Sequence, residues 1–259
     1  MRSLFYGCKL LLLLIFSGWV QADETWKLEF GGGLAAYDTP WVDMPIQYIT
    51  LPYINAEYGR WRLGVKHGIF QYRLSGDNWP VSLSAGLNYR DETYDSVFSF
   101  NDKLSDDPVF TGYQSPDGEV TAQLNAKWQH LSLSVSQDVS DHSSGTVADL
   151  SYMHPLYQGD RGVQFLMGGG ARWLSEKYSD YLYGVYGDNI APQYGRVTYQ
   201  AEAATNYQLT MQLIYPFNRQ WSLSAQASYE WLDQTIQDSP LVDKSGVGKV
   251  MVFFTYRKM

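Results

Sequence analysis

Residues 220–259 read QWSLSAQASYEWLDQTIQDSPLVDKSGVGKVMVFFTYRKM, and this stretch decides the class of fold. Apolar and polar side chains alternate through 221–231, and 250–256 forms a second such segment after a polar run. Because successive side chains on a strand point to opposite faces, each segment has one apolar face and one more polar face. After residue 22, no window of the sequence shows the 3.6-residue apolar period of a helix. The sequence therefore predicts an all-β protein.

Residues 1–22 have the pattern of a secretory signal peptide. Arg2 and Lys9 precede an unbroken apolar run over 10–16, and small residues lead up to Ala22. The run is shorter than the roughly 20 apolar residues that a membrane-spanning helix needs. We expect cleavage after Ala22, which leaves 23–259 as the mature domain. Cys8, the only cysteine, would leave with the signal, so disulfides and thiolate metal sites are excluded.

The composition of the remaining chain narrows the class further. Loss of Arg2 and Lys9 would change the formal net charge from −8 to −10, and an acidic chain without a basic stripe is a poor binder of nucleic acid. No later segment is long and apolar enough for a transmembrane helix. The only remaining way to span a bilayer is a closed β-barrel, in which every backbone group is paired.

Eleven alternating segments follow the signal. They cover 26–34, 47–58, 61–74, 81–90, 119–128, 131–136, 146–153, 163–173, 199–215, 221–231 and 250–256. Bacterial single-chain barrels have an even number of strands. A break at His67-Gly68 would divide the third segment into two short strands. We therefore predict an antiparallel transmembrane β-barrel of twelve strands, with ten strands as the alternative.

The lengths of the connections predict which rim faces which side. In these barrels one rim carries long extracellular loops and the other carries tight periplasmic turns. The long connections are 91–118, 139–145, 175–198 and 232–246, and the short ones are 75–79, 129–130, 155–162 and 216–219. A soluble β-sandwich would also bury alternating strands. The Trp and Tyr residues near the strand ends instead favour a membrane barrel, because aromatic girdles lie at the bilayer interfaces.

Several short motifs in the second half of the chain point to a known family. They include Tyr183-Gly184-Val185, Trp221-Ser222-Leu223 and the closing Thr255-Tyr256-Arg257. The most distinctive motif, here called the signature loop, is Asp238, Ser239, Pro240, Leu241, Val242, Asp243 and Lys244. With these motifs the chain resembles the MltA-interacting protein (MipA/OmpV) family of Gram-negative outer membranes. The chain departs from the family in ending on Lys258-Met259, whereas barrels of this kind tend to end on an aromatic residue.

The resemblance implies an outer-membrane barrel and suggests its partners. The best-known member of the family is regarded as a scaffold that links a murein lytic transglycosylase, which is a murein hydrolase, to a penicillin-binding murein synthase. Other members are described as surface antigens or adhesins. The alternative functions are a narrow channel or porin and a surface adhesin. Apart from outer-membrane lipid, the sequence itself specifies no partner and no oligomeric state, and it carries no cofactor motif.

The four histidines are the first candidates for catalysis. None of His67, His130, His142 and His154 forms a metal-ligand spacing. An outer-membrane lipid hydrolase would need a serine, a histidine and an orienting polar group together. The one such set on a predicted extracellular loop is His142 with Ser143 and Ser144, oriented by Asp141. Adjacent residues rarely form this arrangement, so we expect a protein without catalytic or metal-binding residues.

Charged residues at inward-facing strand positions are candidates for lining the lumen. They are Arg62, Arg73, Arg90, Glu119, Lys127, Arg172, Glu202 and Glu230. Such groups either pair across the lumen and close it, or line a narrow aqueous path. The signature loop has a proline and two aspartates on a predicted surface loop, and we expect it to fold back over the barrel mouth.

Overall fold

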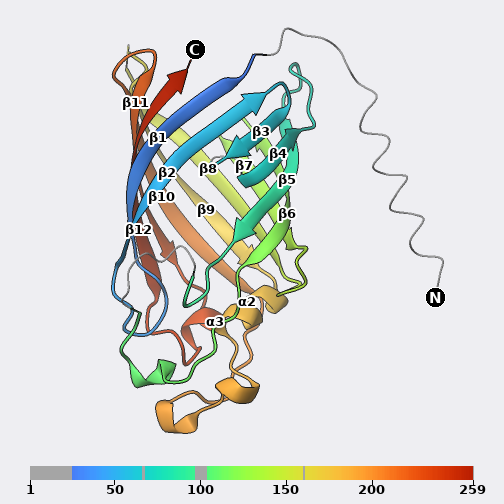
Figure 1. Cartoon of the computed structure of the whole chain (residues 1–259), viewed down its shortest axis with the longest axis vertical. Coiled ribbons are helices and arrows are strands. Elements are labelled where there is room, and N and C mark those ends of the chain that lie inside the picture. Colours follow the sequence, from blue (N-terminus) through green and yellow to red (C-terminus); the bar gives the residue numbers. More distant parts are fainter. Residues whose placement is uncertain (1–24, 66–67, 97–103, 160, 259) are drawn as a thin grey trace, which may run out of the picture.

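The structure is a computed structural model that describes residues 25–65, 68–96, 104–159 and 161–258. In this part of the chain twelve antiparallel strands form a closed barrel (Figure 1). The strands are β1 (Lys27–Tyr37), β2 (Gln47–Tyr58), β3 (Trp61–Gly64), β4 (Gly68–Arg73), β5 (Ser82–Arg90), β6 (Glu119–Trp128), β7 (Leu131–Asp138), β8 (Thr146–Gln158), β9 (Gln164–Leu174), β10 (Ala204–Pro216), β11 (Trp221–Trp231) and β12 (Gly246–Lys258). The prediction of twelve strands is confirmed. The predicted signal peptide lies outside the described residues.

Closure of the barrel joins the two ends of the chain. Strand β12 pairs with β1 in a register that runs from Leu28 opposite Lys258 to Tyr37 opposite Lys249. Every other strand pairs with its neighbours in sequence. Because the sheet closes on itself, no long strand edge is offered to another chain.

The two rims differ as the connection lengths predict. The long connections lie at one end, together with the helical segments, and the short turns lie at the end where β12 finishes (Figure 1). The short turns identify the periplasmic rim and the long loops the extracellular rim.

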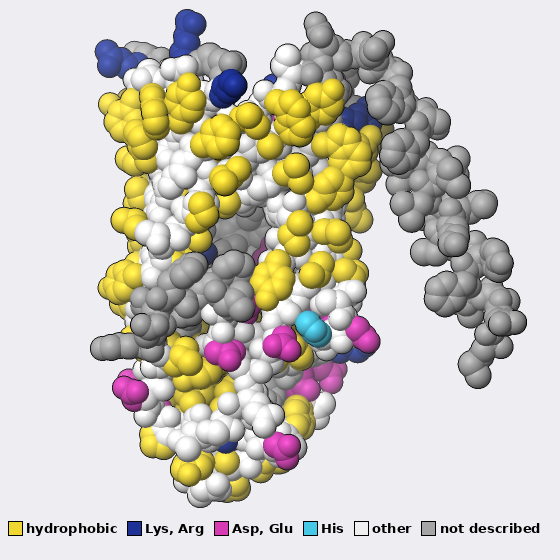
Figure 2. All heavy atoms as spheres, viewed as in Figure 1, with side chains coloured by type: hydrophobic (Ala, Val, Ile, Leu, Met, Phe, Trp, Pro, Cys, Tyr) yellow, Lys and Arg dark blue, Asp and Glu magenta, His cyan; other side chains and the backbone are white. Residues whose placement is uncertain are grey.

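The outward face of the strands is apolar. Leu34, Leu124 and Val250 are 64%, 55% and 51% exposed, and each follows an inward-facing residue on its strand. Figure 2 shows hydrophobic side chains scattered over the whole wall of the barrel. So much exposed apolar surface is unfavourable in water but suits the hydrocarbon core of a bilayer. Trp61, Trp128 and Trp221 lie at the periplasmic ends of their strands, where an aromatic girdle belongs.

The predicted break in the third segment is present between β3 and β4. These two strands have only 4 and 6 residues, and their register shifts between Arg62 and Gly64. Gly64 has a φ of +111°, and a Cβ there would collide with the carbonyl oxygen of Ile54. Glycine is therefore required at the point where β3 stops. His67 lies outside the described residues.

Helices were not expected from the sequence, and here the prediction is wrong. The described residues include two α-helices, α2 (Glu176–Tyr183) and α3 (Gln234–Gln237). It also has three short 3₁₀ helices, η1 (Pro108–Phe110), η2 (Gly187–Asn189) and η3 (Pro192–Tyr194). All lie in the extracellular connections. Among the described residues, no helix is long and apolar enough to cross a membrane.

Helix α2 begins after Ser175 and ends before Gly184, within a predicted loop. Its buried residues are Tyr178, Ser179, Leu182 and Tyr183, spaced one helical turn apart. The spacing was present in the sequence, but two turns are too short for the apolar period to stand out. Residues 199–203, expected to begin a strand, belong to the same connection, because β10 starts only at Ala204.

Candidate functional site: a capped lumen

The extracellular mouth of the barrel is covered by a hydrophobic core that the long connections share. We call this layer the cap. Its buried members come from strand ends and four separate connections: Trp41, Met44, Tyr94, Val109, Phe110, Val147, Leu174, Tyr178, Leu182, Tyr183, Val185, Ala201, Ala204, Leu232, Ile236, Leu241 and Val242. The lumen-facing ends of β8, β9 and β10 supply the floor of this core. Apolar burial therefore holds the loops against the barrel.

The signature loop lies at the centre of the cap. Leu241 is fully buried, and Val242 is 7% exposed. The amide of Val42 donates to the carbonyl oxygen of Leu241 at 3.0 Å, and Trp41 forms an isolated β-bridge with Val242. The Ser239 hydroxyl donates to the carbonyl oxygen of Tyr183 at 2.7 Å. The signature loop thus contacts both the connection between β1 and β2 and the end of α2. These contacts are those of a loop that folds back over the barrel mouth.

Charged residues of the same loop fasten it to the connection between β1 and β2. The Asp243 carboxylate accepts from the amide of Asp43 at 2.9 Å. The Lys244 ammonium forms an ion pair with Asp38 and donates to the carbonyl oxygen of Met44 at 3.2 Å. Asp43 has a φ of +49°, a conformation that few residues other than glycine adopt. The contact at Asp243 therefore holds a strained turn in place.

The two aspartates of the signature loop should differ in effect. Asp243→Ala removes the acceptor for an amide of the β1–β2 connection. The Asp238 side chain, among the described residues, accepts from Gln234 in its own turn of helix. We expect Asp243→Ala to increase protease cleavage of the extracellular loops on intact cells several-fold, consistent with a net contribution of about 1 kcal/mol from one exposed hydrogen bond. Asp238→Ala is the matched control. Equal cleavage of the two variants would contradict this role for Asp243.

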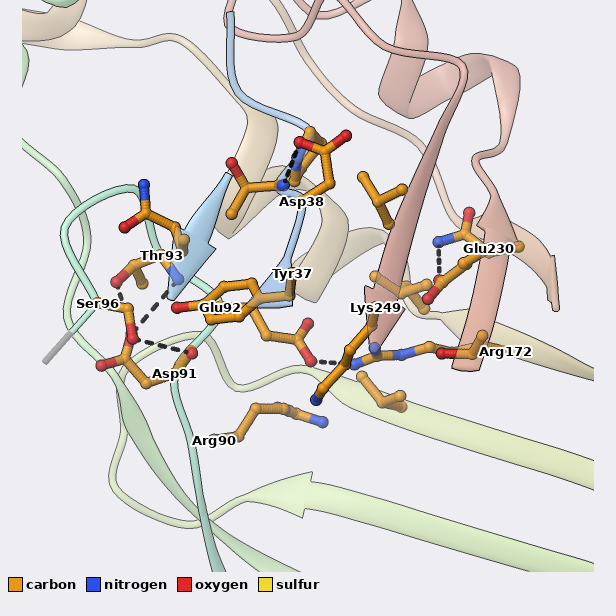
Figure 3. A pocket seen from close by; sticks show the side chains of 18 of the residues that line it. Tyr37, Asp38, Arg90, Asp91, Glu92, Thr93, Ser96, Arg172, Glu230 and Lys249 are labelled. Carbon is orange, nitrogen blue, oxygen red and sulfur yellow. Dashed lines mark hydrogen bonds and ion pairs between the residues drawn. The ribbon is translucent and has the colours of Figure 1, made fainter. Parts of the chain in front are cut away.

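A cavity of about 640 Å³ lies in the lumen directly beneath the cap. It is lined by residues from most strands of the barrel. Figure 3 shows some of them, including Tyr37, Arg172 and Lys249. On the β2 side the lining is apolar, with Ile49 and Leu51. The opposite wall is polar, and its charged members are Arg90, Asp149, Arg172 and Glu230. The lumen beneath the cap is therefore wide enough for water, and the hydrophobic core of the cap lies above it.

The polar wall contains two groups of ion pairs, one centred on Arg90 and the other on Arg172. Arg90 and Glu119 face each other on β5 and β6, and both side chains are buried, at 8% and 2% exposure. The Arg90 Nε lies 2.7 Å from Glu119 Oε1. Arg172 on β9 lies 2.5 Å from Glu92 Oε1 and 3.7 Å from Asp149 Oδ1. Figure 3 shows Glu92 reaching Arg172 from its own connection, so a loop residue is tied to the far wall.

The charge at Arg172 determines the ionisation of Glu92. Burial on its own would raise the pKa of this carboxyl group, but the Arg172 guanidinium and its hydrogen bond outweigh burial and lower the pKa below the usual range. Tyr178 also donates to Glu92, at 3.1 Å. Glu92 is therefore ionised at neutral pH and links the cap to the barrel wall.

The residues predicted to line the lumen lie in three regions: the cavity wall, the periplasmic ends of the strands and an extracellular connection. Arg90, Arg172 and Glu230 line the cavity, and Glu119 lies behind Arg90. Arg62, Arg73 and Lys127 lie at the periplasmic end of their strands. Glu202 is exposed in the extracellular connection before β10 and lies on no strand.

Sequence reasoning missed other charged residues of the cavity. Asp149 and Lys249 precede the outward-facing Leu150 and Val250, so alternation could have identified both as inward-facing. Lys249 has no carboxylate within ion-pair distance among the described residues. Alternation could not have identified Glu92, because this residue lies in a connection and not on a strand.

In the structure, His142 and Ser143 of the hydrolase alternative form hydrogen bonds with other groups. The His142 Nδ1 lies 2.8 Å from the carbonyl oxygen of Gly118. The Ser143 hydroxyl donates to Glu119, and its oxygen accepts from the amide of Gly145 at 2.9 Å. These contacts stabilise the 139–145 connection. In the described part of the chain, no group of three or more His, Cys, Asp or Glu side chains could hold a metal ion.

Comparison with protein families and curated proteins gives consistent matches. A family model described as MltA-interacting protein MipA matches residues 30–258. The MltA-interacting protein of Escherichia coli strain K12 is 27% identical over 236 residues, which cover 89% of this chain and 90% of that protein. An outer membrane protein of the same strain, YiaT, is 27% identical over 147 residues, which cover 54% and 58% of the two chains.

Solved structures with a similar arrangement are more distant. OprB of Pseudomonas putida is 8% identical with a TM-score of 0.40, and the match covers 91% of this chain and 94% of that one. OprD of Pseudomonas aeruginosa is 10% identical with a TM-score of 0.32, over 93% and 95% of the two chains.

Proposed function

This chain belongs to the MltA-interacting protein MipA family of outer-membrane barrels, and on that premise we propose that it is a non-catalytic scaffold for murein-processing enzymes. Its partner is a murein lytic transglycosylase, with a penicillin-binding murein synthase as the second protein of the assembly. The support for the hydrolase is the name of the E. coli relative, which matches over 89% of this chain.

The cap is the structural observation that carries this proposal. A diffusion pore needs a continuous aqueous path, and here the extracellular mouth is filled by buried side chains such as Trp41, Ile236 and Leu241, each no more than 1% exposed. The lumen beneath carries paired charges, and the pair between Arg172 and Glu92 joins a connection to the barrel wall. These features favour a barrel that presents a periplasmic surface over a barrel that conducts.

Crosslinking in intact cells tests the scaffold function. The full chain is crosslinked in growing cells, purified in detergent, and its partners are identified by mass spectrometry. We expect a murein lytic transglycosylase to be recovered with the chain at least about tenfold above its level with an unrelated barrel of similar abundance, a ratio that corresponds to about 1.4 kcal/mol of specific binding.

Other outcomes point elsewhere. Absence of any murein enzyme from the crosslinked material would contradict the scaffold function. Recovery of host or matrix molecules that is abolished by trimming the extracellular connections would support the adhesin alternative instead.

A further inference from the structure

Charge is distributed unevenly along the barrel axis. The periplasmic end carries most of the basic residues that the structure describes: Lys27, Arg60, Arg62, Arg73, Lys127, Arg161, Arg219, Arg257 and Lys258. The described carboxylates at this end are only Glu29, Glu57 and Asp77. Figure 2 shows dark blue side chains at this end and magenta side chains at the capped end. We call these nine cations the basic ring.

Most members of the basic ring form no ion pair among the residues that the structure describes. Arg73 pairs with Asp77 at 2.8 Å, and Arg257 pairs with Glu29 at 3.6 Å. The exposed cations with no ion pair in the described part of the chain are Lys27, Arg60, Lys127, Arg161, Arg219 and Lys258. Like charges held together in this way repel one another. Binding of an anion relieves this repulsion and therefore lowers the free energy of the protein.

The direction of the side chains decides what kind of anion can reach them. Lys127 shares a strand face with Glu119 and Thr121, which are buried in the barrel wall. Lys27 shares a face with Glu29, whose carboxylate accepts from the inward-facing Tyr53. Alternation turns these lysines towards the lumen mouth. Lipid headgroups surround the outside of the barrel, so they cannot contact the inward-facing members of the ring.

Three further cations lie in the periplasmic turns. Arg60, Arg161 and Arg219 lie in the turns between β2 and β3, between β8 and β9, and between β10 and β11. All three are exposed. These three turns and the inward-facing Lys27 and Lys127 place positive charge on several sides of the lumen mouth.

A ring of this kind fits an extended polyanion better than a compact protein surface. Stable protein interfaces have a desolvated centre rich in aromatic side chains. Here Trp61, Trp128 and Trp221 of the same end are exposed on the outward face of their strands, in the membrane girdle. Many exposed charges, each contributing weakly, instead suit a polymer that makes contacts at several points together.

From these observations we propose that the basic ring binds murein itself. Murein lies directly beneath the outer membrane, and its peptide stems carry more carboxylates than amines. The chain would then hold the polymer close to any murein enzyme that it recruits. This inference goes beyond the scaffold function and does not depend on it, because it concerns the polymer and not the enzyme.

The test is sedimentation of the purified full chain, in a neutral detergent, with isolated murein sacculi. The variant is Arg60→Glu/Arg161→Glu/Arg219→Glu, which changes only exposed turn residues. We expect at least about tenfold weaker binding than for the unaltered chain, since each lost contact between exposed charges contributes modestly and three are removed. Binding of the unaltered chain should also weaken as salt is raised.

Matched controls distinguish binding at the basic ring from a general effect of net charge. Arg161→Glu alone and Lys177→Glu make the same charge change at opposite ends of the barrel, both at exposed residues, and only Arg161→Glu should weaken binding. Heat-modifiable gel migration verifies that each variant is folded. Sacculi with amidated carboxylates should bind poorly.

Three outcomes would overturn the proposal. One is equal binding of the triple variant and the unaltered chain to sacculi. Another is retention on vesicles containing phosphatidylglycerol without retention on sacculi, which would assign the ring to lipid. The third is capture of a transglycosylase without any binding to sacculi, which would assign the ring to an acidic protein and leave the scaffold function standing.

Discussion

Replacing Leu241 with aspartate is expected to open the extracellular mouth of the barrel. Leu241 is fully buried in the cap, at the point where the signature loop meets the connection between β1 and β2. Loss of a buried leucine side chain costs about 2–5 kcal/mol, and a carboxylate cannot remain in that core without a partner. The signature loop should therefore leave the core, while the strand pairing that closes the barrel stays intact.

Two measurements report the opening. In planar bilayers the unaltered chain should insert without stepwise conductance, and Leu241→Asp should conduct. On intact cells the extracellular loops of the variant should become cleavable by protease. Ile190→Asp is the matched control, because Ile190 lies at the same end but is 39% exposed. A variant that remains protected and silent, or an unaltered chain that conducts, would show that the cap does not close the lumen.

Replacing Arg90 with methionine is expected to destabilise both the barrel wall and the cap. The substitution leaves Glu119, which is 2% exposed, without its guanidinium partner, and removal of one member of a buried pair costs about 3–5 kcal/mol. Arg90 also donates to the Ser136 hydroxyl at 2.9 Å and lies 3.9 Å from the ring centre of Tyr178 in α2. Loss of the guanidinium should therefore loosen α2 as well.

Urea unfolding in lipid vesicles, followed by heat-modifiable migration, measures this effect. The double variant Arg90→Met/Glu119→Leu should recover most of the lost stability, because it removes both buried charges together. Arg90→Lys should recover less, because an ammonium lacks the fork that contacts Glu119 and Ser136 at once. Equal stability of Arg90→Met and the unaltered chain would contradict a structural role for this pair.

The strands and their order around the barrel were largely predictable. Alternation of apolar and polar residues is local, and it located strands such as β6 and β11 at their observed bounds. The lengths of the connections fixed which rim faces outward. The break between β3 and β4 followed from the even strand count, and Gly64 supplies its physical cause.

The cap and its contacts were predictable only in part. A fold-back of the signature loop was expected from its proline and aspartates, but its contacts with Val42 and Tyr183 join residues far apart in sequence. Helix α2 was missed, since its helical spacing extends over only two turns. Glu92 was missed as well, because its ion pair with Arg172 depends on where a connection crosses the lumen.

The sequence by itself determined a membrane barrel, its orientation and its family. These follow from periodicity, connection lengths and short motifs, all of which are local properties of the chain. Only the tertiary structure showed that separate connections build one hydrophobic cap over the mouth, and that basic residues without an ion pair in the described part of the chain gather at the periplasmic rim. Both depend on side chains from many strands and connections meeting in space, and no single segment of the sequence carries that information.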